Sequence, residues 1–364
     1  MLSPLDDYPV HQIAEVMRHV GTSDRNFYDR YYFNCYPMNA DVFLIVGLGQ
    51  YPNLATMDAF ALARRGDDHL VVRASRALGN DRMDLSVGPF KVDVLEGLRR
   101  LRVVLEPTEH DLAFDLVFEG GIPATLEPRH FRRENERVTF DSKRFAQTGT
   151  WQGSLTIDGD VYAVTPQSWQ GNRDRSWGVR PVGEDEPAGR RMPSTFFWIY
   201  SVMQFADFSI LVIMQEDEHG HRLIEEAVRV RPSGEVEMLA SPAHELTFAP
   251  ETRDVTSAVL RMGDLTVQCE LLLPAHLGVG TGYGRLEPDW RHGMWQGDLV
   301  VQGQRRKVPE FDLPTRMFCP VDVLTRFHLS DVDGSHHTGT GLFEVAVIGP
   351  HDQYGFASFL DVTP

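Results

Sequence analysis

Short apolar segments that alternate with polar residues run through most of the chain, and tight turn pairs such as Asp158-Gly159 and Asp333-Gly334 separate many of them. Helical periodicity is convincing only near residues 10–19, with a weaker signal at 94–99. The pattern therefore predicts an antiparallel, all-β protein with one short N-terminal helix, and it lacks the helices of a doubly wound α/β fold. The expected strands lie at residues 42–46, 70–72, 101–105, 112–118, 154–157 and 161–164, and then at 196–204, 209–214, 226–230, 255–262, 265–273, 297–301, 323–328 and 342–348.

One motif occurs twice. Residues 149–159 read GTWQGSLTIDG, and residues 293–303 read GMWQGDLVVQG, with the same spacing of Trp, Gln, Gly, Leu and the closing Gly. The apolar stretch that ends at 122–124 is echoed by the one that ends at 273–275. A repeat distance of this size is that of a whole domain, and 364 residues are enough for two. We therefore expect an internal duplication in which each half holds the same set of strands.

The acidic stretch at residues 183–189, which contains Gly and Pro, reads as a linker. It predicts an N-terminal domain at 1–183 and a C-terminal domain at 190–364. Each domain is expected to be an antiparallel β-barrel or sandwich.

Composition narrows the possible partners and the compartment. The formal net charge of −17 argues against nucleic acid, because phosphate recognition needs clustered Lys and Arg. Cys35, Cys269 and Cys319 are scattered and odd in number, which is typical of reduced thiols in a cytoplasmic protein. No apolar stretch reaches the length of a membrane span, and residues 1–20 lack the apolar segment of a signal peptide. The sequence leaves the oligomeric state open, a homodimer included.

The densest chemistry lies at residues 170–181, QGNRDRSWGVRP. Arg173, Asp174 and Arg175 are consecutive there, between an amide and an indole. Two interpretations stay open: a buried ion-pair network that closes a barrel, or a reactive site built around the carboxyl group.

Residues 172–178, NRDRSWG, followed about twenty residues on by Phe197-Trp198, resemble the Arg-Asp-His-Ser-Trp-Gly signature of carotenoid 1,2-hydratase-like and AttH-like proteins. Relatives of that superfamily include tocopherol cyclase and fungal decalin-forming cyclases. The resemblance implies two tandem lipocalin-like, or calycin-like, domains. It also implies hydration, isomerisation or cyclisation of a terpenoid, steroid-like or polyketide molecule. Arg175 stands where the family usually has histidine, and a guanidinium that stays charged cannot act as an acid.

Such a reaction needs a proton donor, an apolar pocket and aromatic faces that stabilise a carbocation. The resemblance makes Asp174 the expected acid, with Arg173 and Arg175 beside it. Two flanking arginines would lower the pKa of a carboxyl group, which opposes proton donation unless burial reverses the effect. The expected substrate-binding residues are Asn172, Trp177, Trp198, Tyr200, Asp58 and Glu226.

Asp58 and Glu226 follow the first long apolar strand of their halves, so each could point a carboxylate into its barrel or outward into solvent. The histidine pairs at 219 and 221 and at 336–337 lack a third ligand at short spacing, so no metal is expected. No cofactor is expected either, because the chain has neither a dinucleotide fingerprint nor a phosphate loop. The competing hypothesis is a lipid-binding module without chemistry.

Overall fold

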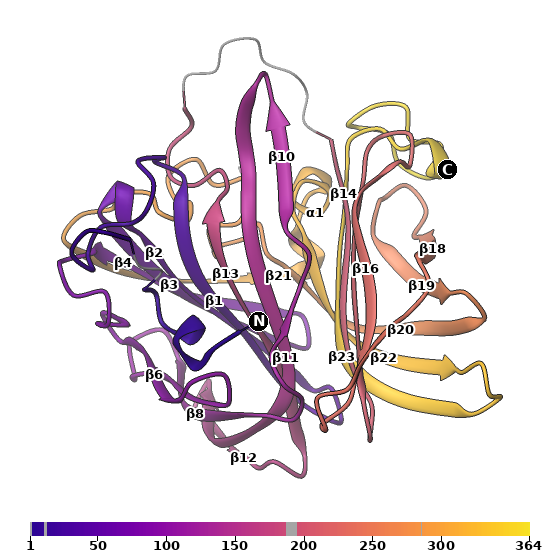
Figure 1. The fold of residues 1–364 in the computed structure, drawn as a ribbon, viewed down its shortest axis with the longest axis horizontal. Helices are drawn as coiled ribbons and strands as arrows, with labels where there is room; N and C mark the ends of the chain where they lie inside the picture. Colours follow the sequence, from indigo (N-terminus) through magenta and orange to yellow (C-terminus); the bar gives the residue numbers. More distant parts are fainter. Residues whose placement is uncertain (1, 11–12, 187–194, 285) are drawn as a thin grey trace. The chain divides into compact units, whose positions relative to one another are not determined.

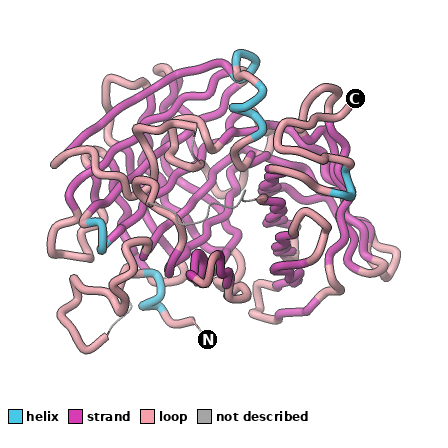
Figure 2. The backbone as a smooth tube through the Cα atoms, turned by 90° about the horizontal axis from the view of Figure 1, so that it is seen from above, coloured by secondary structure: helices cyan, strands magenta, loops and turns pink. Residues whose placement is uncertain are grey.

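The computed structural model describes residues 2–10, 13–186, 195–284 and 286–364. Within these residues the chain is almost entirely β-structure (Figures 1 and 2). It divides into two compact units, and the predicted all-β class with two lipocalin-like domains is confirmed. Unit 1 holds Met1–Ala188, Gly280–Gly282 and Glu287–Lys307, and unit 2 holds Gly189–Val279, Tyr283–Leu286 and Val308–Pro364.

Unit 1 is an antiparallel sheet that curls into a nearly closed barrel. Its main path runs β21-β4-β3-β2-β1-β13-β11-β8-β7-β6-β5, and β9, β10 and β12 pair with β11. The strands are β1 (Phe27–Pro37), β2 (Val42–Tyr51), β3 (Thr56–Arg65), β4 (Asp68–Ala77), β5 (Ser86–Val87), β6 (Phe90–Glu96), β7 (Arg100–Leu105), β8 (Leu112–Gly120), β9 (Thr125–Leu126), β10 (His130–Glu134), β11 (Arg137–Ile157), β12 (Asp160–Val164), β13 (Trp169–Val179) and β21 (Leu299–Lys307).

Alternation along the strands builds the core of unit 1, because successive side chains point to opposite faces of a sheet. On β1 the odd-numbered residues Tyr31, Phe33 and Cys35 enter this core, as do Met57, Ala59, Ala61 and Ala63 of β3. Trp151 from β11 packs among them and donates its indole N–H to the carbonyl of Asn34 at 2.8 Å. The barrel interior is thus filled by side chains.

Unit 2 is an antiparallel half-barrel with its own core, which Phe197, Ile199 and Met214 help to form. Its strand order is β17-β16-β15-β14-β23-β22-β20-β19-β18, and the short helix α1 (Leu313–Met317) begins after the cap residue Asp312. The strands are β14 (Phe196–Gln204), β15 (Ser209–Glu216), β16 (Arg222–Val230), β17 (Val236–Met238), β18 (Pro242–Phe248), β19 (Val255–Met262), β20 (Leu265–His276), β22 (Val321–Ser330) and β23 (His336–Ile348).

The repeated motif does not mark equivalent positions in the two units. Its first copy lies in β11, and its second copy leads into β21, which pairs with β4 of unit 1 rather than with a strand of unit 2. Trp151 is buried, whereas Trp295 is 49% exposed. Gly153 and Gly297 do share a positive φ, at +137° and +123°, a backbone conformation that glycine adopts most readily. What the two copies share is therefore a local backbone conformation at this glycine. The end of the predicted linker, at 187–189, lies outside the described residues.

The predicted N-terminal helix at 10–19 is not observed in its described residues, which form turns and bends. A 3₁₀ turn, Pro4–Asp7, precedes them. Val16 and Met17 are exposed, so the apolar stripe has no surface to pack against, and a helix of ten residues is marginal without such packing. Residues 94–99 end β6 and turn into β7. Across the described part of the chain, no helix is long and apolar enough to cross a bilayer.

Candidate functional site

The motif at residues 172–178 lies in β13, and strand alternation divides its charged side chains between two faces. Arg173 is paired with Phe33 of β1, and Arg175 is paired with Tyr31. Because Phe33 and Tyr31 face the core of unit 1, both arginines point into the barrel. Asp174 points to the opposite face.

Arg173 is a buried cation with a carboxylate partner from the N-terminus. Its Nη1 and Nη2 atoms lie 2.5 and 3.0 Å from Oδ1 and Oδ2 of Asp7, and neither side chain has exposed surface. Its Nε donates to Gln147 at 2.9 Å. The guanidinium carbon also lies 5.7 and 5.1 Å from the ring centres of Phe118 and Phe145. This bidentate ion pair has the geometry in which Arg recognises a carboxylate.

Arg175 forms the second buried ion pair, with Asp29 at 2.7 Å, and donates to the carbonyl of Asp6 at 2.8 Å. Burial acts to lower the pKa of Arg175, but the charge of Asp29 and the neighbouring Tyr31 outweigh it, so the pKa is raised. Burial raises the pKa of Tyr31 well above its usual value, and its hydroxyl donates to the carbonyl of Asp7. Arg175 therefore stays cationic and Tyr31 stays a neutral donor.

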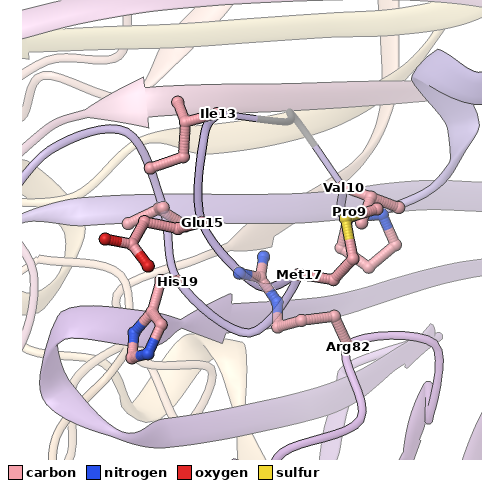
Figure 3. A pocket seen from close by; sticks show the side chains of 8 residues that line it. Pro9, Val10, Ile13, Glu15, Met17, His19 and Arg82 are labelled. Carbon is pink, nitrogen blue, oxygen red and sulfur yellow. The ribbon is translucent and has the colours of Figure 1, made fainter.

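Arg82 links this charge cluster to a small surface pocket. Its Nη2 lies 3.9 Å from Asp29, and its backbone carbonyl accepts from Nε2 of Gln50 at 2.9 Å. Figure 3 shows the Arg82 side chain at the pocket beside Met17. The free space measures about 10 Å³, which holds no more than about one water molecule. The other lining residues are Pro9, Val10, Ile13, Glu15, His19 and Val20.

The structure separates the residues that the motif had suggested would act together. Asp174 is half-buried on the face opposite the arginines, and its cross-strand neighbours are Tyr32 and Ala146. The expectation that Arg173 and Arg175 flank its carboxyl group is therefore wrong, because consecutive strand residues point apart. These guanidiniums bind Asp7 and Asp29 instead.

Asn172 shares the face of Asp174 and is buried. Its Oδ1 accepts from Nδ2 of Asn34 at 2.7 Å, and its backbone N–H donates to Oδ1 of Asn34 at 2.8 Å. Trp177 lies on the arginine face, with its ring centre 5.8 Å from the guanidinium carbon of Arg175. The candidate site residues of the motif at 172–178 are thus divided between the two faces of β13.

Trp198 and Tyr200 belong to β14 of unit 2 and stack with ring centres 6.1 Å apart. Both alternate with the core residues Phe197 and Ile199, so they point away from the core of unit 2. Glu226 of β16 is half-exposed on this same outward face, so it does not point into the core of its half-barrel.

Asp58 also faces away from its barrel core, yet it is buried rather than solvated. The N–H of Gly293 donates to its Oδ2 at 2.7 Å, and the hydroxyl of Tyr51 donates to its Oδ1 at 3.0 Å. Nδ1 of His292 lies 3.6 Å from Oδ1. Burial alone would raise the pKa of Asp58, but His292 lowers it below its usual value. Burial and then the charge of Arg30 lower the pKa of His292 to about 3.

Unit 2 holds a buried cluster that the sequence did not indicate. The two carboxylate oxygens of Glu216 lie 2.9 Å from Nε2 of His244 and 2.8 Å from Nε2 of His351. Nδ1 of His244 lies 2.6 Å from the hydroxyl of Tyr354, and the ring of Phe197 packs against both imidazoles. Burial acts to raise the pKa of Glu216, but the two histidines lower it to about 2.

Neither histidine cluster had a local signal in the sequence. His292 is far from Asp58 along the chain, and the members of the Glu216 cluster come from separate strands and loops. In the described ranges, no group of three or more His, Cys, Asp or Glu side chains is arranged to hold a metal ion.

A family of unknown function, DUF8625, matches residues 2–357. The chain belongs to this family. No curated protein matches the sequence of this family member. Its fold, however, matches solved structures over most of its length.

An AttH-type protein from Nitrosomonas europaea has 12% identity and a TM-score of 0.58, over 95% of this chain and 99% of that one. Kievitone hydratase from Nectria haematococca has 12% identity and a TM-score of 0.55, over 94% and 96%. CghA in complex with Sch210972 has 11% identity and a TM-score of 0.52, over 89% of both chains. At these identities the likeness establishes the fold, which is the one that the motif at 172–178 had indicated.

Proposed function

We propose that this protein is an enzyme that hydrates, isomerises or cyclises a hydrophobic small molecule of the terpenoid, steroid-like or polyketide class. The proposed reaction is promoted by a protein acid and uses no cofactor. Two solved structures with the same fold carry the names of a hydratase, kievitone hydratase, and of CghA, bound to Sch210972. Fold likeness alone does not assign an activity, so the proposal depends on a site within the chain.

One observation carries the proposal: β13 places Asp174 on the face opposite Arg173 and Arg175, the two arginines next to it in the sequence. A guanidinium next to a carboxyl group favours the ionised form and weakens it as a proton donor. Arg173 and Arg175 instead bind Asp7 and Asp29 on the inner face. Asp174 is the carboxyl group that we assign as proton donor.

The surroundings of Asp174 suit a weakly solvated reaction. Tyr32 is its direct neighbour on β1 and is 5% exposed, and Asn34 and Asn172 on the same face are buried. In a hydration, the carboxyl group would transfer its proton to one alkene carbon while water bonds to the other. The carboxylate would then recover a proton from that water. Arg173 and Arg175 are positioning residues that fix β13 from its inner face.

The test is a comparison of product formation by the wild type and by Asp174→Asn. Each protein is incubated with terpenoid, steroid and polyketide extracts, and the organic extract is analysed by mass spectrometry. We expect a loss of about 10²- to 10⁴-fold in turnover, the usual contribution of a general acid. Asp141→Asn is the matched control, because Asp141 lies partly exposed on β11 and pairs with exposed Arg129.

Unchanged turnover by Asp174→Asn, with a normal far-ultraviolet spectrum, would rule out this residue as the acid. A ligand that both proteins retain without converting it would contradict the enzymatic proposal and would indicate a hydrophobic-ligand-binding protein.

A further inference from the structure

The N-terminus of the described chain enters unit 1 and supplies one of its buried charges. Residues 3–10, here called the N-terminal plug, place the carboxylate of Asp7 on Arg173 with no exposed surface on either side chain. Burying a charge is unfavourable unless it is paired, so Arg173 requires an anion at this position. The chain fills the position with its own carboxylate.

Polar contacts concentrated at Asp6 and Asp7 hold the plug. The carbonyl of Asp6 accepts from Arg175, the carbonyl of Asp7 accepts from Tyr31, and the carboxylate of Asp7 accepts from the N–H of Leu98. The apolar side chain of Leu5 is 70% exposed and contributes little burial. Pro9 is buried and Tyr8 and Val10 are half-buried, so the plug has less buried apolar surface than a core strand and is expected to open before the barrel does.

The plug also depends on a close approach at the turn between β6 and β7. A Cβ atom at Gly97 would lie 2.3 Å from the carbonyl oxygen of Pro4 and 2.9 Å from its Cβ. The main chain of Pro4 can therefore pack here only because residue 97 has no side chain. This contact lies outside the arginine cluster, so it can be changed without altering a charge.

The site beneath the plug has the chemistry of a receptor for a hydrophobic carboxylate. Arg173, Arg175 and Arg82 would remain there with Asp29 after Asp7 withdraws, which leaves three cations and one anion. Aromatic rings surround the guanidiniums: Phe118 and Phe145 lie by Arg173, and Tyr31 and Trp177 lie by Arg175.

We propose that the N-terminal plug is removable and that Asp7 occupies the site of a ligand carboxylate whose hydrophobic or aromatic body replaces the plug. A guanidinium fork matches a carboxylate in two parallel hydrogen bonds, as it already does with Asp7. A small pocket is lined by Pro9 and Val10 at the end of the plug and by Arg82 (Figure 3). The ligand and the plug compete for Arg173, so the plug inhibits binding of the ligand. The proposal is independent of the reaction assigned to Asp174.

Hydrogen exchange of the whole protein tests the competition, with decanoate as the probe. Decanoate at millimolar concentration is expected to speed amide exchange in residues 3–10 and at Leu98 by about tenfold or more, because it takes Arg173 from Asp7. Decanol has the same chain without the charge and is expected to have no effect, and acetate is expected to act only at much higher concentration. Equal effects of decanol and decanoate, or no effect of decanoate, would overturn the proposal.

Two variants separate the plug from the site. Gly97→Ala is expected to loosen the plug without a ligand and to lower the decanoate concentration needed for half of the effect by about tenfold, because less competition remains. Arg173→Met in the same background is expected to abolish the decanoate effect. Decanoate that still acts on the protein without Arg173 would show that the carboxylate binds elsewhere. Exchange in β2 reports whether either variant has lost the barrel.

Chemical rescue provides a second measurement that does not depend on Gly97. Asp7→Gly removes the internal carboxylate, and added acetate is expected to raise its melting temperature relative to chloride at equal ionic strength. Asp141→Gly is the matched control, since Asp141 forms a comparable two-pronged contact with Arg129 at the surface. Acetate that stabilises both variants equally, or neither, would contradict a carboxylate site at Arg173.

Discussion

At the scale of single residues, the buried pair of Arg173 and Asp7 makes a clear energetic prediction. Arg173→Met would leave the Asp7 carboxylate buried without its cation, which costs about 3 to 5 kcal/mol. Urea denaturation measures this loss in the free energy of unfolding. Arg129→Met, at the exposed pair with Asp141, is expected to cost less than about 1 kcal/mol. Similar losses in the two variants would show that the buried pair contributes no more than a surface pair.

His292 predicts how stability depends on pH. Its folded pKa of about 3 lies below the ordinary value of 6.5, so the unfolded state binds a proton that the folded state does not. Above pH 6.5 the histidine is neutral in both states and does not lower the free energy of unfolding. As the pH drops from 6.5 toward 3, the free energy of unfolding falls by up to about 1.4 kcal/mol per pH unit.

Denaturation of the wild type at several pH values between 6.5 and 5 measures this slope. His292→Asn is expected to flatten it, whereas His328→Asn, at an exposed histidine, is expected to leave it unchanged. If His292→Asn kept the wild-type slope, another group would be responsible.

Sequence reasoning found the motif of the site but not its partners. The period of two in a strand is enough to place Asp174 opposite Arg173 and Arg175, provided that residues 172–178 are recognised as a strand. Asp7 and Asp29 could not be predicted as partners, because they are far from these arginines along the chain and only the barrel brings them together.

At the scale of elements, most apolar strands were predictable, and β13 shows why others were not. Its inward positions hold Arg173 and Arg175 where a strand normally carries apolar residues. A prediction that depends on alternating apolar residues therefore misses a strand whose inward side chains are charged and buried as ion pairs. The segment at residues 10–19 shows the opposite failure, since its helical pattern has no surface to pack against.

The pairing of β21 with β4 can be tested by a substitution within the ladder. Val301 is opposite Ala74, and Val301→Pro removes a backbone N–H and imposes a φ that suits a strand interior poorly. We expect amide exchange in β4 to become about tenfold faster or more, which corresponds to about 1.4 kcal/mol. Val301→Ala keeps the N–H and is expected to have a smaller effect. Equal amide exchange rates in the two variants would mean that the hydrogen bonds between β21 and β4 do not protect β4 from exchange.

At the scale of the whole molecule, the sequence indicated two lipocalin-like domains but not how the chain is shared between them. Contact with Asp58 and with β4 assigns residues 287–307 to unit 1, although unit 2 precedes and follows them. No local sequence pattern predicts that residues 287–307 belong to unit 1, because their position depends on which sheet has an unpaired edge strand.

A fragment of residues 1–186 should therefore be incomplete. It lacks β21 and the N–H of Gly293 that binds Asp58, so we expect it to melt at a lower temperature than the full chain. A synthetic peptide of residues 287–307 is expected to raise that melting temperature in proportion to its occupancy, and a scrambled peptide is not. A fragment that melts like the full chain, with no response to the peptide, would show that β21 is dispensable.

The late return of β21 also imposes a waiting time during synthesis. β4 ends at Ala77 and β21 begins at Leu299, about 220 residues later. At roughly 5 to 20 residues per second, the ribosome needs roughly 10 to 45 s to supply the missing strand. Through that interval the nascent chain presents an unpaired edge to its neighbours on the same messenger, which invites pairing between chains. The yield of this protein should thus depend on how quickly residues 78–307 are translated.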